Sequence, residues 1–397
     1  MVTAAGSRRE PPTPDFHRYR VVPLAAATLD GPLVTLDWPD GTHLTVHALW
    51  LWENRFGTAI EPRTREGMLD PAELPPPDVL VGVRPDDDGH LLATWAHGEV
   101  SRHHAGWLRH VAAGVHRPGA LIPDPEPWTT AELSEPPTLP GPPVLAGDPV
   151  ALRSFLELLC RRGLARLEGL PTSSDVVERV AAHIGALRDT NFGITWSVTV
   201  DVDPSSTANT NLPLPAHTDL PTRETPPGFQ FLHCRVNTCH AGFSHMSDGL
   251  AVVAELARSH PDAHEALTTL RWIFFDRSPE HDHRWSGPII DAIPGRPLTV
   301  RAFHPVRAFP DMDPAEVGRA YDALRTFARV AASDAFQMRY PFRPGDLVAF
   351  DNRRILHGRG AIDGGGTRAL TGCYLDNDEV YSRLRVLTRA ATNGEVP

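Results

Sequence analysis

Short apolar runs separated by turn residues mark the first part of the chain. The stretches "YRVVPLAAATLDGPLVTLDWPDGTHLTVHALWLWENR" (19–55) and "LLATWAHGEVSRHHAGWLRHV" (91–111) show this spacing. Such runs are typical of β-strands joined by tight turns. We expect a small β-rich domain at 16–112, preceded by a Pro-, Ser- and Arg-containing segment at 1–15 that favours disorder.

A proline-dense stretch follows at 113–147 and predicts a linker, since proline suits neither helix interiors nor central strands. Beyond it, helical periodicity appears at 150–163, 173–189 and 313–333, and strand-like runs at 193–202, 228–237, 270–276, 346–351 and 369–376. Asp148-Pro149 is a plausible N-cap and first residue for the first of these helices. The predicted fold of 148–390 is therefore mainly β with flanking helices.

Composition excludes several classes of protein. The chain has 397 residues and a net charge of -11, without a Lys/Arg cluster that would favour nucleic acid or anionic membrane. It has no long apolar run, and its N-terminus lacks the apolar segment of a secretory signal, so we expect a cytoplasmic protein. Its four cysteines show no CxxC spacing, which favours reduced thiols.

Three His-x-Asp/Glu triplets occur, about the number that chance predicts from 20 His and 49 acidic residues. They are His97-Gly-Glu99, His217-Thr-Asp219 and His260-Pro-Asp262. The middle one is distinguished by its setting in an extended segment, where side chains at i and i+2 point to the same side and can converge on one ion.

A third ligand is available at His357, at the end of an apolar strand, and Arg368 lies on the next one. Two His and one carboxylate that leave open coordination positions are typical of non-haem Fe(II) oxygenases. Arg368 has the fork geometry to pair with the distal carboxylate of 2-oxoglutarate.

With these residues in place, the chain resembles the γ-butyrobetaine dioxygenase and trimethyllysine dioxygenase branch of the taurine dioxygenase superfamily. The resemblance is carried by "HTDLPTRETPPGFQFLHC", "FDNRRILHGR" and "GCYLDNDEVYSRLRVL", and more weakly by "ALWLWENR" and "WAHGEVSRHHAGWLRH" near the N-terminus. It implies a double-stranded β-helix (jelly roll) with iron held by His217, Asp219 and His357. It also implies that Arg368, supported by Ser244, binds 2-oxoglutarate.

The implied activity is hydroxylation of an unactivated C–H bond in a small amine or amino-acid-like molecule, with O2 consumed and succinate and CO2 released. Relatives that lose the carboxylate ligand halogenate, so Asp219 favours hydroxylation. The family also implies a homodimer. The residues leave open desaturation, cyclisation or bond cleavage by the same iron chemistry, and a non-catalytic β-helix that only binds a ligand.

The family's small N-terminal domain carries a structural zinc held by a Cys cluster and one His. The matching stretch here, 51–69, contains no Cys, and Glu99 falls where the His is expected. A structural site needs a closed shell of four ligands, so we predict no zinc.

Family members that bind trimethylammonium groups surround the cation with aromatic faces. Local alignment assigns the corresponding positions to Phe192, Trp196, Asn209 and Tyr374, so one aromatic has become an amide. Ser206 stands where a polar residue would hold the substrate carboxylate. We expect a less methylated amine, or another polar small molecule, to be at least as suitable as γ-butyrobetaine.

Overall fold

The computed structural model describes residues 10–199, 209–276, 280–292, 297–302, 307–362, 366–391 and 395–396. Two compact units make up the chain: one comprises 1–121 with 388–397, and the other comprises 122–387. In the described parts of the chain, no helix is long and apolar enough to cross a bilayer.

The first unit contains two three-stranded antiparallel sheets, β2-β3-β4 and β5-β6-β7. Alternate residues of the strands enter the core, as Val34 and Leu36 do on β3 and as Leu91, Ala93 and Trp95 do on β6. One face of each of these two strands is therefore buried, as the pleat of a strand allows. The elements are β1 (Arg18–Tyr19), β2 (Ala26–Asp30), β3 (Leu33–Asp37), β4 (His43–His47), α1 (Ala48–Glu53), β5 (Leu80–Pro85), β6 (Leu91–Trp95), β7 (Val100–His103), α2 (Ala105–Ala112) and β23 (Glu395–Val396).

Residues 10–15, which composition predicted to be disordered, pack against this unit. The Glu10 carboxylate lies 2.7 Å from Nε2 of His104, and Thr13 is buried. These contacts order residues 10–15, although their composition favours disorder.

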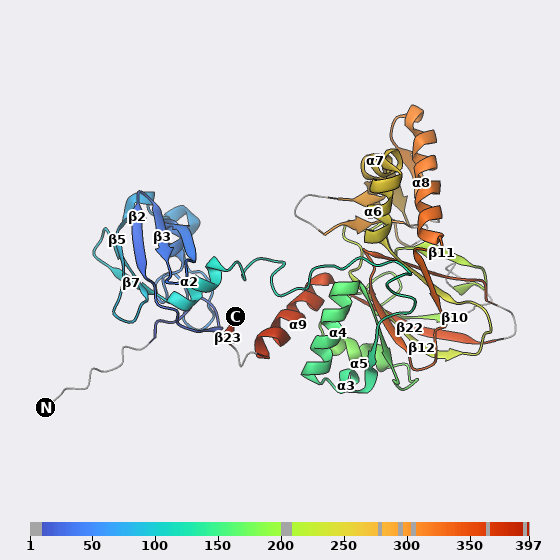
Figure 1. The fold of residues 1–397 in the computed structure, drawn as a ribbon, viewed down its shortest axis with the longest axis horizontal. Helices are drawn as coiled ribbons and strands as arrows, with labels where there is room; N and C mark the ends of the chain where they lie inside the picture. The colour runs from blue at the N-terminus through green and yellow to red at the C-terminus, as the bar shows by residue number, and fades with distance from the viewer. Residues whose placement is uncertain are drawn as a thin grey trace. The chain divides into compact units, whose positions relative to one another are not determined.

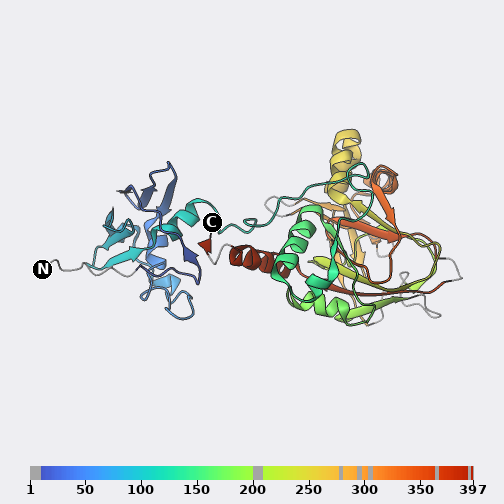
Figure 2. The ribbon, with the colours of Figure 1, turned by 60° about the horizontal axis from the view of Figure 1, so that its bottom comes forward.

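Two antiparallel sheets form the centre of the second unit (Figures 1 and 2). The larger has the order β10-β22-β12-β20-β9-β8, in which only β8 and β9 run parallel, and the smaller has the order β11-β21-β13-β19. Their strands are β8 (Thr138–Pro140), β9 (Leu164–Glu168), β10 (Thr195–Thr199), β11 (Leu214–His217), β12 (Phe229–Asn237), β13 (Ser244–Asp248), β19 (Gln337–Tyr340), β20 (Leu347–Asp351), β21 (Ile355–Arg359) and β22 (Arg368–Leu375).

Helices cover one face of the six-stranded sheet. Apolar residues of α4, α5 and α9 share one core with inward residues of β12, β20 and β22, including Phe155 and Phe231, whose rings meet edge to face. The opposite face of the sheet packs on the four-stranded sheet through a second core that contains Leu232, Met246 and Phe350. The helices are α3 (Gly141–Leu145), α4 (Pro149–Arg162), α5 (Val176–Ala182) and α9 (Asn377–Ala390).

The proline-dense stretch differs from the prediction in its last residues, because β8 and α3 lie within 138–145. β8 is an edge strand, and α3 has its prolines in the first turn, the two settings in which proline is tolerated.

A third core joins three helices to a small sheet of order β15-β14-β18. The predicted helix at 313–333 and strand at 270–276 are confirmed as α8 and β14, whereas α6 and α7 were not predicted. The elements are α6 (Gly249–Ser259), α7 (Pro261–Thr269), β14 (Arg271–Phe275), β15 (Arg284–Gly287), β16 (Ile290–Asp291), β17 (Thr299–Val300), β18 (Arg307–Asp311) and α8 (Val317–Ala332).

Candidate metal centre and active-site cavity

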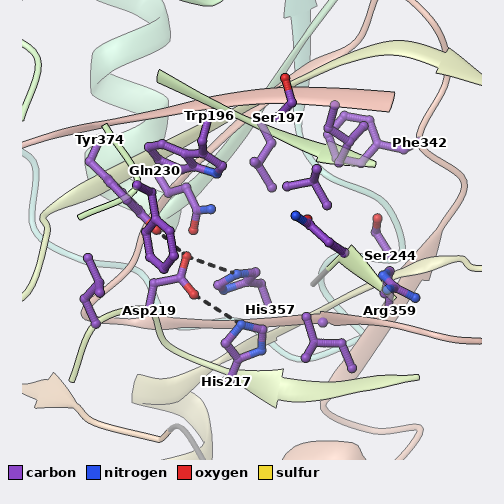
Figure 3. Close-up of a pocket in the computed structure, with 18 of the residues that line it drawn as sticks. Trp196, Ser197, His217, Asp219, Gln230, Ser244, Phe342, His357, Arg359 and Tyr374 are labelled. Carbon is purple, nitrogen blue, oxygen red and sulfur yellow. Dashed lines mark hydrogen bonds and ion pairs between the residues drawn. The ribbon is translucent and has the colours of Figure 1, made fainter. Parts of the chain in front are cut away.

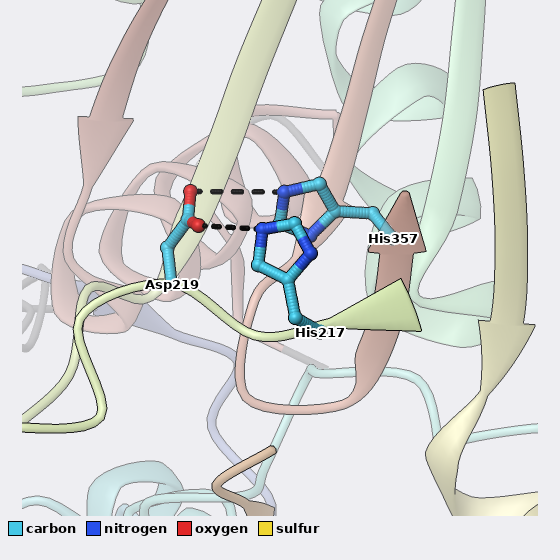
Figure 4. Close-up of side chains that lie close together, drawn as sticks. All are labelled: His217, Asp219 and His357. Carbon is cyan, nitrogen blue, oxygen red and sulfur yellow. Dashed lines mark ion pairs between the residues drawn. The ribbon is translucent and has the colours of Figure 1, made fainter. Parts of the chain in front are cut away.

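Strand pairing brings two histidines together that are 140 positions apart in the sequence. His217 ends β11, and its antiparallel partner across the ladder to β21 is His357. Their rings lie with centroids 4.2 Å apart. Asp219 lies two residues beyond the end of β11, on the same side as His217 (Figure 4).

The three side chains present their donor atoms to one point. Nε2 of His217 is 3.2 Å from Oδ1 of Asp219, and Nε2 of His357 is 3.7 Å from Oδ2. One ligand atom from each residue lies within 4.8 Å of the others, and among the described residues no other group of three or more His, Cys, Asp or Glu side chains is arranged in this way. Nδ1 of His217 donates to the Pro215 carbonyl at 2.9 Å, which leaves its Nε2 lone pair for a metal.

Burial sets the ionisation of this cluster. Burial, with the neighbouring His217, lowers the pKa of His357 to about 3, so its imidazole is neutral and able to ligate. Burial opposes ionisation of Asp219, but the facing imidazoles and a hydrogen bond from Tyr374 hold its pKa below the usual range. Two imidazoles beside a carboxylate are the donor set that Fe(II) takes in such sites.

Second contacts orient Asp219. The Tyr374 hydroxyl donates to its Oδ2 at 2.6 Å. The backbone N–H of Asp219 donates to Oδ1 of Asn352 at 2.7 Å. Nδ2 of Asn352 donates to the backbone carbonyl of Asp219 at 3.0 Å. Asp219 is therefore fixed although it lies outside a strand.

A cavity of about 430 Å³ opens on the cluster between the two sheets (Figure 3). Every described member of the predicted site lines it: His217, Asp219, His357, Arg368, Ser244, Phe192, Trp196, Asn209 and Tyr374. Ser206 lies outside the described residues.

At one end of β22, Arg368 is a buried cation with few partners. Its side chain is 6% exposed, and its Nη2 is 3.5 Å from the Ser244 hydroxyl. Its Nε has no hydrogen-bond partner among the described residues. Burial lowers the pKa of this guanidinium. A buried, incompletely paired guanidinium in a cavity is suited to a carboxylate ligand.

Aromatic residues gather near the other end of β22. Tyr374 of this strand lies beside Trp196 of the neighbouring β10, with ring centroids 4.1 Å apart at 30°. Phe192, which precedes β10, is 45% exposed. The hydroxyl of Tyr374 donates a hydrogen bond to Asp219. The predicted role of Tyr374 in a cation cage did not suggest this contact with a metal ligand.

Several cavity residues were not predicted. Gln230 pairs with Tyr374 across β12 and β22, is 3% exposed, and points with its amide toward Asp219 and His357 in Figure 3. Its position was marked in the sequence by a polar residue within an apolar strand. Phe342 and Asp276 also line the cavity, and only their positions in the fold reveal this.

The first His-x-Glu triplet has a different setting. His97 and Glu99 are 3.0 Å apart, and the Glu99 carboxylate also accepts from Arg55 at 2.8 Å, with the Arg55 guanidinium over the Trp52 ring at 3.5 Å. Glu99 is thus an ion-pair partner in the first unit. The absence of zinc stays a prediction.

Comparisons with known proteins agree with this geometry. The sequence model of one protein family, taurine catabolism dioxygenase TauD, TfdA family, matches residues 129–374. Gamma-butyrobetaine dioxygenase of Pseudomonas sp. (strain AK-1) is 34% identical over 382 residues, 94% of this chain and 99% of that protein. The mitochondrial trimethyllysine dioxygenase of Rattus norvegicus is 26% identical over 351 residues, 85% of this chain and 82% of that protein.

Among solved structures, PvcB of Pseudomonas aeruginosa aligns with a TM-score of 0.49 and 21% identity, over 63% of this chain and 90% of that one. The family match covers more than half of the chain and includes all three residues of the metal cluster. The chain therefore belongs to the taurine catabolism dioxygenase TauD, TfdA family and is an Fe(II)- and 2-oxoglutarate-dependent dioxygenase.

Proposed function

We propose that this enzyme hydroxylates a C–H bond of a small amine or amino-acid-like molecule in the cavity described above. His217, Asp219 and His357 would hold Fe(II), and Arg368 with Ser244 would hold the distal carboxylate of 2-oxoglutarate. The observation that carries the proposal is the convergence of the three metal donors within 4.8 Å in the same cavity as the incompletely paired Arg368.

Fe(II) held there would supply the oxidising chemistry: 2-oxoglutarate and O2 would be consumed, succinate and CO2 released, and one oxygen atom of O2 inserted into the C–H bond. The chain contributes position and solvent exclusion. Arg368 fixes one end of the co-substrate through charge, Tyr374 and Asn352 fix the Asp219 ligand, and the buried cavity walls exclude water from the reacting groups.

The substrate end of the cavity favours a cationic group. Aromatic side chains line it there: the Trp196 and Tyr374 rings pack on each other, and Phe192 also lines the cavity. The names of the relatives point to γ-butyrobetaine and trimethyllysine as substrates of those proteins. Because Asn209 replaces one aromatic face, we propose a less methylated amine or a γ-butyrobetaine-like acid, with Ser206 as the partner of its carboxylate.

Four further proposals accompany this one: a double-stranded β-helix for the catalytic domain at 148–390, a zinc-free N-terminal domain at 16–112, a homodimer and a cytoplasmic location. The two facing antiparallel sheets support the first. The pairing of Glu99 with Arg55 supports the second, because this carboxylate already has a cationic partner. The last two are supported by the resemblance to the bacterial relative.

The test is succinate formation by protein treated with EDTA and then supplied with Fe(II), O2 and 2-oxoglutarate. γ-Butyrobetaine, trimethyllysine, their dimethyl and monomethyl analogues and a panel of amino acids are each compared with a no-substrate control. We expect turnover only after iron is restored, with stimulation by an amine.

His357→Ala should abolish turnover, whereas His245→Ala, on the neighbouring strand β13 and outside the metal cluster, should retain it. Turnover that survives in His357→Ala would overturn the metal assignment. Iron-dependent turnover that no member of this panel stimulates above the no-substrate control would overturn the proposed substrate class.

A further inference from the structure

The middle residue of the His-x-Asp triplet is held by a segment of chain more than 80 residues away. The Thr218 hydroxyl donates to the Val300 carbonyl at 3.1 Å and accepts from the Ala302 N–H at 3.0 Å. The Thr218 N–H donates to the Ala302 carbonyl at 3.0 Å. Thr218 is 2% exposed, so these three bonds replace contacts with water.

The residue between these two partners, Arg301, binds the loop that follows the triplet. Its guanidinium donates to the carbonyls of Pro221 at 3.0 Å, Arg223 at 2.6 Å and Glu224 at 2.8 Å. It is 3% exposed, and its carbon Cζ lies 3.5 Å from the centre of the Trp285 ring. A planar guanidinium can reach three carbonyls at once, which the single ammonium of a lysine does less well.

These two attachments enclose the metal ligand. Between Thr218 and the loop carbonyls lie only Asp219 and Leu220, and Leu220 has φ 50°, the left-handed region that disfavours a side chain. Such a conformation persists only where the surroundings impose it. The segment 300–302 imposes it here, because it fixes the chain on both sides of this position.

We propose that Thr218 and Arg301 are positioning residues of the metal centre, which place the Asp219 carboxylate and the cavity wall at Leu220–Thr222. The inference rests on the proposed function, since it assigns a role toward the same metal. A positioning role can be told from a purely structural one by metal affinity. Loss of the Thr218 or Arg301 contacts should weaken metal binding more than loss of an equally buried arginine elsewhere.

Four variants test this difference. Thr218→Val removes the hydroxyl at nearly constant volume, and Thr218→Ser restores it. Arg301→Met removes all three carbonyl contacts, and Arg301→Lys keeps the charge over Trp285.

The matched control is Arg166→Met. Arg166 is 6% exposed on β9 and donates to the Thr138 hydroxyl at 2.9 Å, but it does not line the cavity.

Mn(II) dissociation constants and the absorption spectrum of the Co(II)-substituted protein are measured for the full chain, together with Tm. We expect Thr218→Val and Arg301→Met to weaken Mn(II) binding by roughly 10- to 100-fold and to change the Co(II) spectrum. Arg301→Lys should lie between Arg301→Met and wild type, and Thr218→Ser should approach wild type. Arg166→Met should lower Tm without changing metal affinity.

Wild-type Mn(II) affinity and Co(II) spectrum in Thr218→Val and Arg301→Met would overturn the positioning role and leave the proposed function intact. Failure of Thr218→Ser to restore affinity lost in Thr218→Val would also overturn it. Failure of wild-type protein to bind Mn(II) would instead overturn the metal assignment itself, and this inference with it.

Discussion

Replacement of Tyr374 by phenylalanine isolates one hydrogen bond at the metal centre. The Tyr374 hydroxyl donates to Oδ2 of Asp219 at 2.6 Å, and the side chain is 1% exposed. Burial, with the adjacent Asp219 charge, raises the pKa of Tyr374 well above its ordinary value, so the hydroxyl keeps its proton in neutral buffer. Tyr374→Phe preserves the ring that stacks on Trp196.

The size of the effect follows from the charge on the acceptor. A hydrogen bond to a buried charged group contributes about 1.5–3 kcal/mol, and about 1.4 kcal/mol corresponds to a tenfold change in affinity. Tyr374→Phe should therefore weaken Fe(II) or Mn(II) binding by roughly 10- to 100-fold. Tm should also fall, because the hydroxyl bonds the carboxylate in the folded protein without metal, so the Mn(II) affinity is the quantity that decides.

Mn(II) titration followed by electron paramagnetic resonance measures the affinity directly. Tyr381→Phe is the matched control: its hydroxyl accepts from Nδ2 of Asn377 at 3.1 Å on α9, away from the cavity. We expect wild-type Mn(II) affinity in this control. Unchanged Mn(II) affinity in Tyr374→Phe would refute the view that its hydroxyl orients the carboxylate ligand, and would leave Tyr374 only its aromatic role.

Two further predictions concern buried ionisable groups. Arg368→Met should raise the KM for 2-oxoglutarate by roughly 100-fold while Tm stays the same or rises, since a buried, incompletely paired cation is removed; an unchanged KM would contradict the co-substrate assignment. In the first unit, burial and then Arg55 lower the pKa of His103 from 6.5 to about 4. As the pH falls, His103 is protonated in the unfolded chain before it is protonated in the folded one. The free energy of unfolding, measured by urea titration, should therefore fall by roughly 3 kcal/mol between about pH 6.5 and pH 4. The loss should be smaller in His103→Gln.

The metal cluster was accessible to sequence reasoning because each of its parts carries a local signature. An extended His-x-Asp puts two donors on one side, and a histidine at the end of an apolar strand offers a third. Arg368 begins the next apolar strand along the chain. Only strand pairing, however, shows that His217 and His357 face each other across β11 and β21, because register depends on the whole sheet.

The roles of Tyr374 and Thr218 show where local reasoning stops. Alignment placed Tyr374 among cage aromatics, and its hydroxyl binds Asp219, which is 155 positions away. Thr218 occupies the variable place in the triplet, and its partners lie at 300 and 302. Nothing in the neighbouring sequence marks either contact, since both are made by side chains that reach across from another element.

By itself the sequence determined the elements marked by an apolar run or a helical period: the strands β12, β20 and β22 and the helices α4 and α8. It also determined the residues able to ligate a metal. Apolar runs and helical periods are local properties, so they can be recognised without knowledge of the fold. The tertiary structure alone decided the pairing order of the strands, the cavity between the two sheets, and the contacts that hold Asp219 in place. These depend on groups that are distant along the chain, and their relative positions are set only when the two sheets pack against each other.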